Sequence, residues 1–110
     1  MIVETLMLVK AYSPWDACDK EYRIKNPIPI TARGVNCLDH PYGIAADLKA
    51  YPKGTKIIVP GYNNNTPALV DDTGGSIRQA KVKWIEVRFK TEAEAIKWGN
   101  KPLLVKIIYP

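Results

Sequence analysis

Hydrophobic and β-branched residues gather in six short runs, separated by segments rich in glycine, proline and asparagine. Runs of this length and composition predict β-strands. They cover residues 2–12, 43–47, 56–60, 67–71, 84–89 and 102–109. Because the runs lie too close together for repeated strand-helix-strand units, they predict a small, mainly β barrel with antiparallel or mixed strands.

The run 84–89 alternates strictly between apolar and polar positions. Its apolar residues at 85, 87 and 89 are expected to face the core, and the opposite face carries Trp84, Glu86 and Arg88. In the simplest interpretation, Glu86 is an exposed acid beside Arg88 on a solvated face, where such charges contribute little.

One short helix is predicted in the C-terminal half. Thr91 and Glu94 have the spacing of a capping box, and Gly99 ends the helical segment. Residues 13–43 show no sustained period and contain several prolines and glycines, so we expect a long irregular excursion of the kind that is usually functional. Within it, residues 29–34 are expected to form a short extended piece that presents Thr31.

The apolar run 67–71 leads into Asp71-Asp72-Thr73-Gly74-Gly75, which suits a site better than a core. Successive side chains of a strand face opposite sides, so we expect one aspartate in the site and the other to be solvated or structural. A plain turn between two strands is the alternative for this stretch. Asp47, after another short run, is either a site residue or a turn aspartate that caps the following backbone.

Length and composition limit the classes of protein. With 110 residues and 46% hydrophobic composition, we expect residues 1–110 to form a single domain. No run of about 18 apolar residues is present, and residues 1–12 do not have the pattern of a secretory signal. The formal charge of +5 favours polyanions in general, but no basic cluster interleaved with aromatics indicates nucleic-acid binding.

Cysteine and histidine are scarce. Cys18 and Cys37 are either bridged or reduced, and the sequence leaves both alternatives open. Cys37 and His40 have the spacing of metal ligands, but a zinc site needs three or four ligands and the chain has no second histidine. We therefore expect no metal and no other cofactor.

The order and spacing of several short motifs resemble a known family. The motifs are Ala11-Tyr12, Thr31-Ala32-x-Gly34, residues 43–47 (Gly-Ile-Ala-Ala-Asp), Pro52-x-Gly54-Thr55, residues 72–77 (Asp-Thr-Gly-Gly-x-Ile), an acid on the next strand, and an alanine-rich helix ending in Trp98-Gly99. Together they resemble the three-aspartate domain of stationary-phase survival proteins, which is similar to the catalytic region of membrane-bound lytic transglycosylase A. The resemblance covers roughly residues 6–109.

This resemblance implies a six-stranded double-psi β-barrel and a lytic transglycosylase that cleaves the β-1,4 bond between N-acetylmuramic acid and N-acetylglucosamine in peptidoglycan, leaving a 1,6-anhydro end. Asp47 and Asp72 match the first two aspartates of the family. The third match is Glu86, an acid one methylene longer and three residues later than the family spacing, the extra residues lengthening the turn within 79–83.

The resemblance also assigns roles. Glu86 would be the general acid and then base, Asp72 its charge partner and substrate orienter, and Asp47 a second orienter or electrostatic stabiliser. Sugar-binding candidates lie on the loops and on the first strand: Thr31, Thr73, Gly74 and Tyr12. The expected partner is the peptidoglycan glycan strand at the bacterial cell wall, met either by a phage lysis or tail component or by an excised domain of an exported protein.

Two other functions stay open on the sequence. The double-psi barrel also serves expansin-like proteins that bind wall polysaccharide without cutting it, and fold alone does not settle activity. A small structural or interaction domain, whose acids are turn residues, is the third alternative. Clearing of a wall suspension would separate the first function from the other two, and glycan binding would separate the second from the third.

Overall fold

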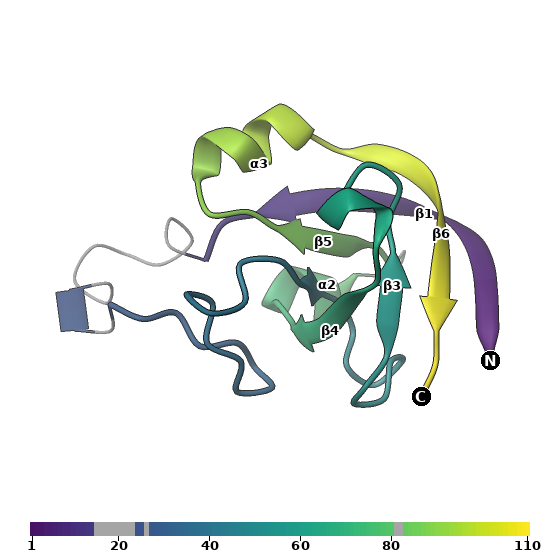
Figure 1. Ribbon diagram of the computed structural model, residues 1–110, viewed down its shortest axis with the longest axis horizontal. Coiled ribbons are helices and arrows are strands. Elements are labelled where there is room, and N and C mark those ends of the chain that lie inside the picture. Colours follow the sequence, from purple (N-terminus) through teal and green to yellow (C-terminus); the bar gives the residue numbers. More distant parts are fainter. Residues whose placement is uncertain (15–23, 26, 81–82) are drawn as a thin grey trace.

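The computed structural model describes residues 1–14, 24–25, 27–80 and 83–110 (Figure 1). Within them the strands are β1 (Ile2–Tyr12), β2 (Ile44–Ala45), β3 (Lys56–Ile58), β4 (Ala68–Asp72), β5 (Ile85–Arg88) and β6 (Lys101–Ile108). The α-helices are α2 (Gly75–Gln79) and α3 (Glu92–Trp98), and η1 (Asn63–Asn65) is a 3-10 turn. The six predicted runs are confirmed as strands, with ends that differ by a few residues.

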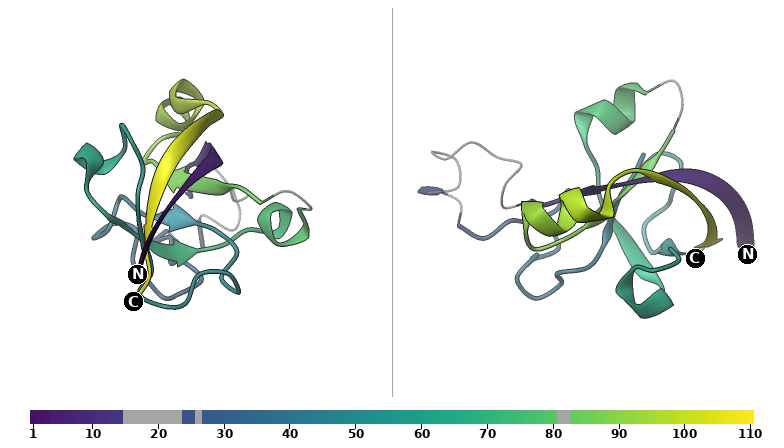
Figure 2. Two further views of the ribbon diagram at one scale, coloured as in Figure 1. Left: turned by 90° about the vertical axis from the view of Figure 1, so that its right-hand side faces the viewer. Right: turned by 90° about the horizontal axis from the view of Figure 1, so that it is seen from above.

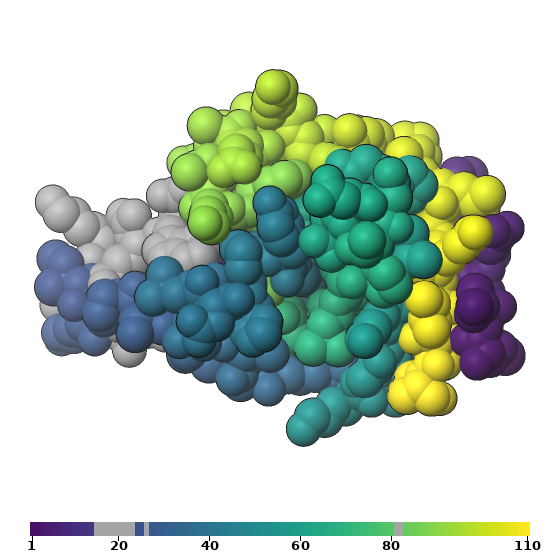
Figure 3. Space-filling model, viewed as in Figure 1, coloured from purple at the N-terminus to yellow at the C-terminus, as the bar shows by residue number. Residues whose placement is uncertain are grey.

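The six strands form one mixed sheet that closes into a ring in the order β1-β5-β2-β4-β3-β6. β1 pairs with β5 and β2 with β4 in parallel, and the other four pairings are antiparallel. β1 and β6 form the longest ladder, from Ile2 opposite Ile108 to Val9 opposite Lys101. Both chain ends therefore lie together at one edge of the molecule (Figures 1 and 3).

The inside of the ring is filled by aliphatic side chains that come from every strand. Those fully shielded from solvent include Val9, Ile44, Ile57, Val70, Ile85, Val87 and Val105. Burying one such side chain contributes about 1.5–3 kcal/mol to folding, so this interior is the main source of stability. The alternation predicted for β5 is confirmed at Ile85 and Val87, which point inward.

Two α-helices are present among the described residues, where the sequence predicted one. α3 has the predicted cap, since the Thr91 side chain accepts a hydrogen bond from the Glu94 N–H, and Gly99 ends it with a positive φ of 71°. α2 was missed because it has only five residues, starts at a glycine and is anchored by one buried side chain, Ile77. α2 and η1 project from opposite sides of the ring (Figure 2).

Candidate functional site

The two adjacent aspartates at the end of β4 have different surroundings. Asp71 is 1% exposed, whereas Asp72 is partly exposed. The pairing of β2 with β4 shifts here, from Ile44 opposite Val70 to Ala45 opposite Asp72, so two residues of β4 stand against one of β2. Such a bulge redirects side chains. The prediction that one aspartate is structural is confirmed for Asp71.

Arg88 is the buried partner of Asp71. Its guanidinium donates to both carboxylate oxygens, at 2.8 and 3.0 Å, and to the backbone carbonyls of His40 and Tyr42. Burial opposes the charge on Arg88, but the hydrogen bonds that it donates to Asp71 and Tyr12, together with its electrostatic attraction to both groups, outweigh it and raise its pKa. The expectation of a solvated Arg88 is therefore wrong, because a buried carboxylate and two carbonyls replace water around it.

The Arg88 guanidinium also restricts which residue can occupy position 43. A Cβ atom at Gly43 would collide with the Arg88 guanidinium, so only glycine fits at this position without displacing Arg88. Gly43 begins the motif that leads into β2, and its carbonyl accepts a hydrogen bond from the Arg88 N–H at 3.0 Å. The glycine of this motif is therefore a packing requirement of the Asp71-Arg88 pair.

Tyr12, at the end of β1, connects this buried pair with Asp72. Arg88 Nη1 lies 3.3 Å from the Tyr12 hydroxyl, which donates to Asp72 Oδ2 at 2.9 Å. Burial, and then the charge of Asp72, raise the pKa of Tyr12 far above its usual value. Tyr12 therefore stays a phenol and remains a hydrogen-bond donor to Asp72.

The second carboxylate oxygen of Asp72 accepts hydrogen bonds from two backbone N–H groups. Asp72 Oδ1 accepts from the Ala32 N–H at 3.0 Å and from the Thr73 N–H at 2.9 Å. The loop that supplies Ala32 is itself fixed, because the Arg33 N–H donates to the Asp71 carbonyl and the Arg33 guanidinium donates to the Val70 carbonyl. The Asp72 carboxylate is thus oriented from β1, from the loop at 31–35 and from its own strand.

The predicted sugar-binding residues around Asp72 differ in exposure. Thr31 is buried rather than presented, because its hydroxyl accepts the Val35 N–H at 3.0 Å and closes the turn that carries Ala32. Thr73 and Gly74 are partly exposed and connect β4 to α2. The Thr73 hydroxyl oxygen is shielded from solvent and has no hydrogen-bond partner in the described part of the protein.

Glu86 of β5 and Asp72 of β4 are separated in the sheet by β2. Ala45 of β2 is the register partner of both acids, in the antiparallel pairing with β5 and the parallel pairing with β4. At about 4.8 Å between neighbouring strands, the Cα atoms of Glu86 and Asp72 are roughly 10 Å apart. The two acids therefore flank Ala45 of β2, one on each neighbouring strand.

The immediate neighbours of Glu86 are Trp84 and Lys10. Glu86 Oε2 accepts from the Trp84 indole N–H at 3.3 Å, and Lys10 is the register partner of Glu86 on β1. The Lys10 ammonium lies 3.9 Å from the centroid of the Trp84 ring, within cation-π distance. Sequence reasoning did not identify Lys10 as a neighbour of Glu86, although strand alternation placed Trp84 on the face of Glu86.

Asp47 lies two residues beyond Ala45, past the end of β2. Its Oδ1 accepts from the Lys49 N–H at 3.2 Å, which is the turn-capping geometry left open from the sequence. Its Oδ2 lies 3.5 Å from the Lys83 ammonium, and Lys83 also reaches the Ile77 carbonyl of α2. Asp47 thus stands at the edge of the candidate site, with one oxygen used by its own turn.

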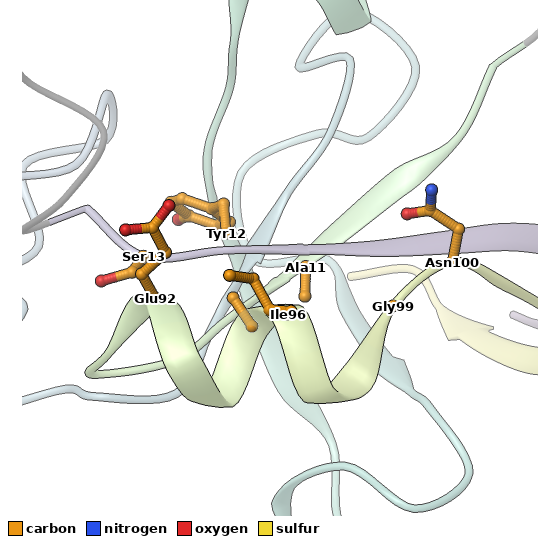
Figure 4. Close-up of a pocket in the computed structure, with 8 residues that line it drawn as sticks. Ala11, Tyr12, Ser13, Glu92, Ile96, Gly99 and Asn100 are labelled. Carbon is orange, nitrogen blue, oxygen red and sulfur yellow. The ribbon is translucent and has the colours of Figure 1, made fainter.

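A pocket of about 370 Å³ opens on the other side of Tyr12, between the end of β1 and α3 (Figure 4). Ala11 and Tyr12 line it from the strand, and Ile96, Gly99 and Asn100 line it from α3 and the residues after it. Its volume falls in the range of small-ligand sites. Tyr12 is therefore shared between the pocket and the Asp72 carboxylate.

The described residues hold no cluster of three or more histidine, cysteine, aspartate or glutamate side chains that could bind a metal ion. Cys37 is buried and is not in a disulfide with a described residue, while Cys18 lies outside the described residues. Burial, above all, raises the pKa of the Cys37 thiol. In the described part of the chain, no helix has the length and apolar character needed to cross a membrane.

Comparison with known proteins identifies relatives of this chain whose names refer to the cell wall. "Putative cell wall shaping protein YabE" of Bacillus subtilis (strain 168) is 39% identical over 80 residues, which cover 71% of this chain and 18% of that protein. "Cell wall-binding protein YocH" of the same organism is 36% identical over 81 residues, covering 72% of this chain and 26% of that protein. This chain thus spans only a minor part of either relative.

No solved structure matches the chain. The family model of the 3D domain matches residues 42–109, more than half of the chain, and includes β2 to β6 with Asp47, Asp72 and Glu86. The resemblance inferred from the motifs is confirmed by this match. The chain belongs to the 3D domain family.

Proposed function

We propose that this chain is a lytic transglycosylase that cleaves the bond between N-acetylmuramic acid and N-acetylglucosamine in the peptidoglycan of the bacterial cell wall. The observation that carries the proposal is the pair formed by the oriented Asp72 carboxylate and Glu86 across Ala45. Membership of the 3D domain family and the cell-wall names of two relatives support the substrate class.

In the proposed mechanism one carboxyl group acts twice. The Glu86 carboxyl gives its proton to the glycosidic oxygen while the bond from that oxygen to the muramoyl C1 breaks. The muramoyl C6 hydroxyl then bonds to C1 and returns its proton to Glu86, which forms the 1,6-anhydro ring without consuming water.

The other site residues position the substrate and stabilise the charge that develops on it. Asp72, fixed by three hydrogen bonds, places a carboxylate where positive charge develops at C1. Asp47 contributes a second acid at the edge of the site, and the partly exposed Thr73 and Gly74, which follow Asp72, bind the sugar. Thr31 and Tyr12 act through the loop and the hydrogen bond that orient Asp72.

Mass spectrometry of soluble products from purified peptidoglycan tests this proposal. The wild type should release anhydro-muropeptides, and Glu86→Gln and Asp72→Asn should each abolish or strongly reduce them. Glu4→Gln is the matched control, because Glu4 is an exposed acid on the distant end of β1. Products with reducing ends would mean a hydrolase, and full activity of Glu86→Gln would remove Glu86 from the mechanism.

Binding of wall polysaccharide without cleavage is the second candidate function, and the name of the relative YocH favours it. Retention on insoluble peptidoglycan with no soluble product from the wild type would support this function over the first. Loss of retention in Asp72→Asn, with retention kept in Glu4→Gln, would place the binding surface at the same acids.

We also infer that the closed ring is a double-psi β-barrel and that residues 1–110 form one domain. The two parallel pairings, β1 with β5 and β2 with β4, each join strands that are not consecutive in sequence, as crossing connections require. An experimental structure with two interlocked crossovers, and a single cooperative unfolding transition, are the observations that test this inference.

A further inference from the structure

The pocket between the end of β1 and α3 shares the Tyr12 side chain with the Asp72 carboxylate. Tyr12 lines the pocket and also donates to Asp72 Oδ2 at 2.9 Å. The pocket and the Asp72 carboxylate are therefore neighbours on the two sides of one side chain. The pocket has no role in the mechanism proposed above.

The lining of the pocket identifies the kind of ligand that it suits. Three small residues, Ala11, Ala95 and Gly99, leave the space open, and Ile96 stands at its rim with 71% of its surface exposed. Asn100 lies at one end of the pocket, and Ser13 and Glu92 lie toward the other (Figure 4). A sugar ring carries hydroxyls on all sides and would leave some of them unpaired against the part of the lining formed by Ala11, Ala95 and Ile96. Small apolar side chains joined by amide groups match it better, because Asn100 can both donate to and accept from an amide.

We propose that this pocket binds the first residues of the peptide that peptidoglycan carries on its muramoyl unit, while the sugar of that unit lies at Asp72. This inference rests on the proposed substrate, because peptidoglycan offers a peptide branch directly beside the glycan bond. The pocket then makes the protein selective for peptide-bearing strands over strands stripped of peptide.

Equilibrium binding and product release, each measured on peptide-bearing and on enzymatically stripped glycan strands, test the proposal. The wild type should bind peptide-bearing strands about tenfold more tightly, which corresponds to about 1.4 kcal/mol. Ile96→Ala and Asn100→Ala should bring the affinity for peptide-bearing strands toward that for stripped strands. Leu104→Ala is the matched control, because Leu104 is an apolar residue of β6 that is 54% exposed and lies outside the pocket.

Equal wild-type affinity for the two substrates, or variants that weaken both to the same degree, would overturn the peptide-binding pocket. These outcomes are distinct from failure of the catalytic proposal, in which neither substrate yields product. In that case preferential binding of the peptide-bearing strand, lost in Ile96→Ala, would still support the pocket, and absence of the preference would reject it.

Discussion

At the residue scale, the adjacent Asp71 and Asp72 carry out separate tasks because a strand turns them to opposite sides. Asp71 pairs with the fully buried Arg88, and Asp72 faces the candidate site. The Tyr12 hydroxyl joins the two, since it accepts from Arg88 and donates to Asp72. The orientation of the site acid is thus coupled to an ion pair in the interior.

Asp71→Asn should destabilise the protein strongly. The substitution leaves the Arg88 charge buried without a carboxylate, and breaking such a pair costs about 3–5 kcal/mol. Urea unfolding followed by circular dichroism measures the change. Glu4→Gln is the control, because both Glu4 and its partner Lys106 are 54% exposed, and we expect less than about 1 kcal/mol there. An equal, small effect of both substitutions would contradict the structural role of Asp71.

The Tyr12→Phe variant should still fold, but its Asp72 carboxylate should be held less rigidly. The ring keeps its packing, but one of the three hydrogen bonds to the Asp72 carboxylate is lost. We expect the rate of anhydro-product release to fall about tenfold, the equivalent of about 1.4 kcal/mol in the barrier, with a smaller change in KM. Tyr42→Phe, at a tyrosine that is 51% exposed, should show the wild-type rate. A KM change without a rate change would assign Tyr12 to substrate binding alone.

At the scale of elements, alternation and turn residues located the strands, and the capping box located α3. They could not reveal that Arg88 is buried, because its partner Asp71 lies 17 residues earlier on a strand that is not a neighbour of β5 in the ring. They also could not reveal the short helix α2, which depends on the burial of Ile77 rather than on local propensity. Asp72 was found because glycines follow it, whereas Trp84 had only its place on the face of Glu86 and Lys10 had no local signal.

Thr91→Ala should weaken α3 and its packing over the ring. The Thr91 side chain accepts from the Glu94 N–H at 3.2 Å, and loss of such a cap costs about 1 kcal/mol. Thr91→Ser keeps the hydroxyl and should stay within a few tenths of a kcal/mol of the wild type. Thermal unfolding of the two variants measures the difference. Equal melting temperatures for both would mean that packing of Trp98 and Ala95 alone holds α3.

At the scale of the whole molecule, closure of the ring brings the candidate site together. Tyr12 and Asp72 are 60 residues apart in sequence, and Tyr12 and Arg88 are 76 apart, yet each pair is hydrogen-bonded. The pairing of β1 with both β5 and β6 makes this possible, because it carries the first strand across the ring to the acids. The site therefore depends on the complete ring and is lost when the ring opens.

The same closure buries tyrosines, which predicts a loss of stability in alkali. Burial, the leading cause in each case, raises the pKa values of Tyr12 and Tyr62 above the value of about 10 expected in the unfolded chain. Below about pH 10 both states hold these protons and stability is unaffected by them. Above it the unfolded chain loses them first, so the free energy of unfolding should fall by about 1.4 kcal/mol per pH unit for each tyrosine. Urea unfolding between pH 8 and pH 11 measures this slope. The Tyr62→Phe variant should show a slope that is smaller by the contribution of one tyrosine, about 1.4 kcal/mol per pH unit. An unchanged slope in that variant would show that other groups cause the alkaline loss.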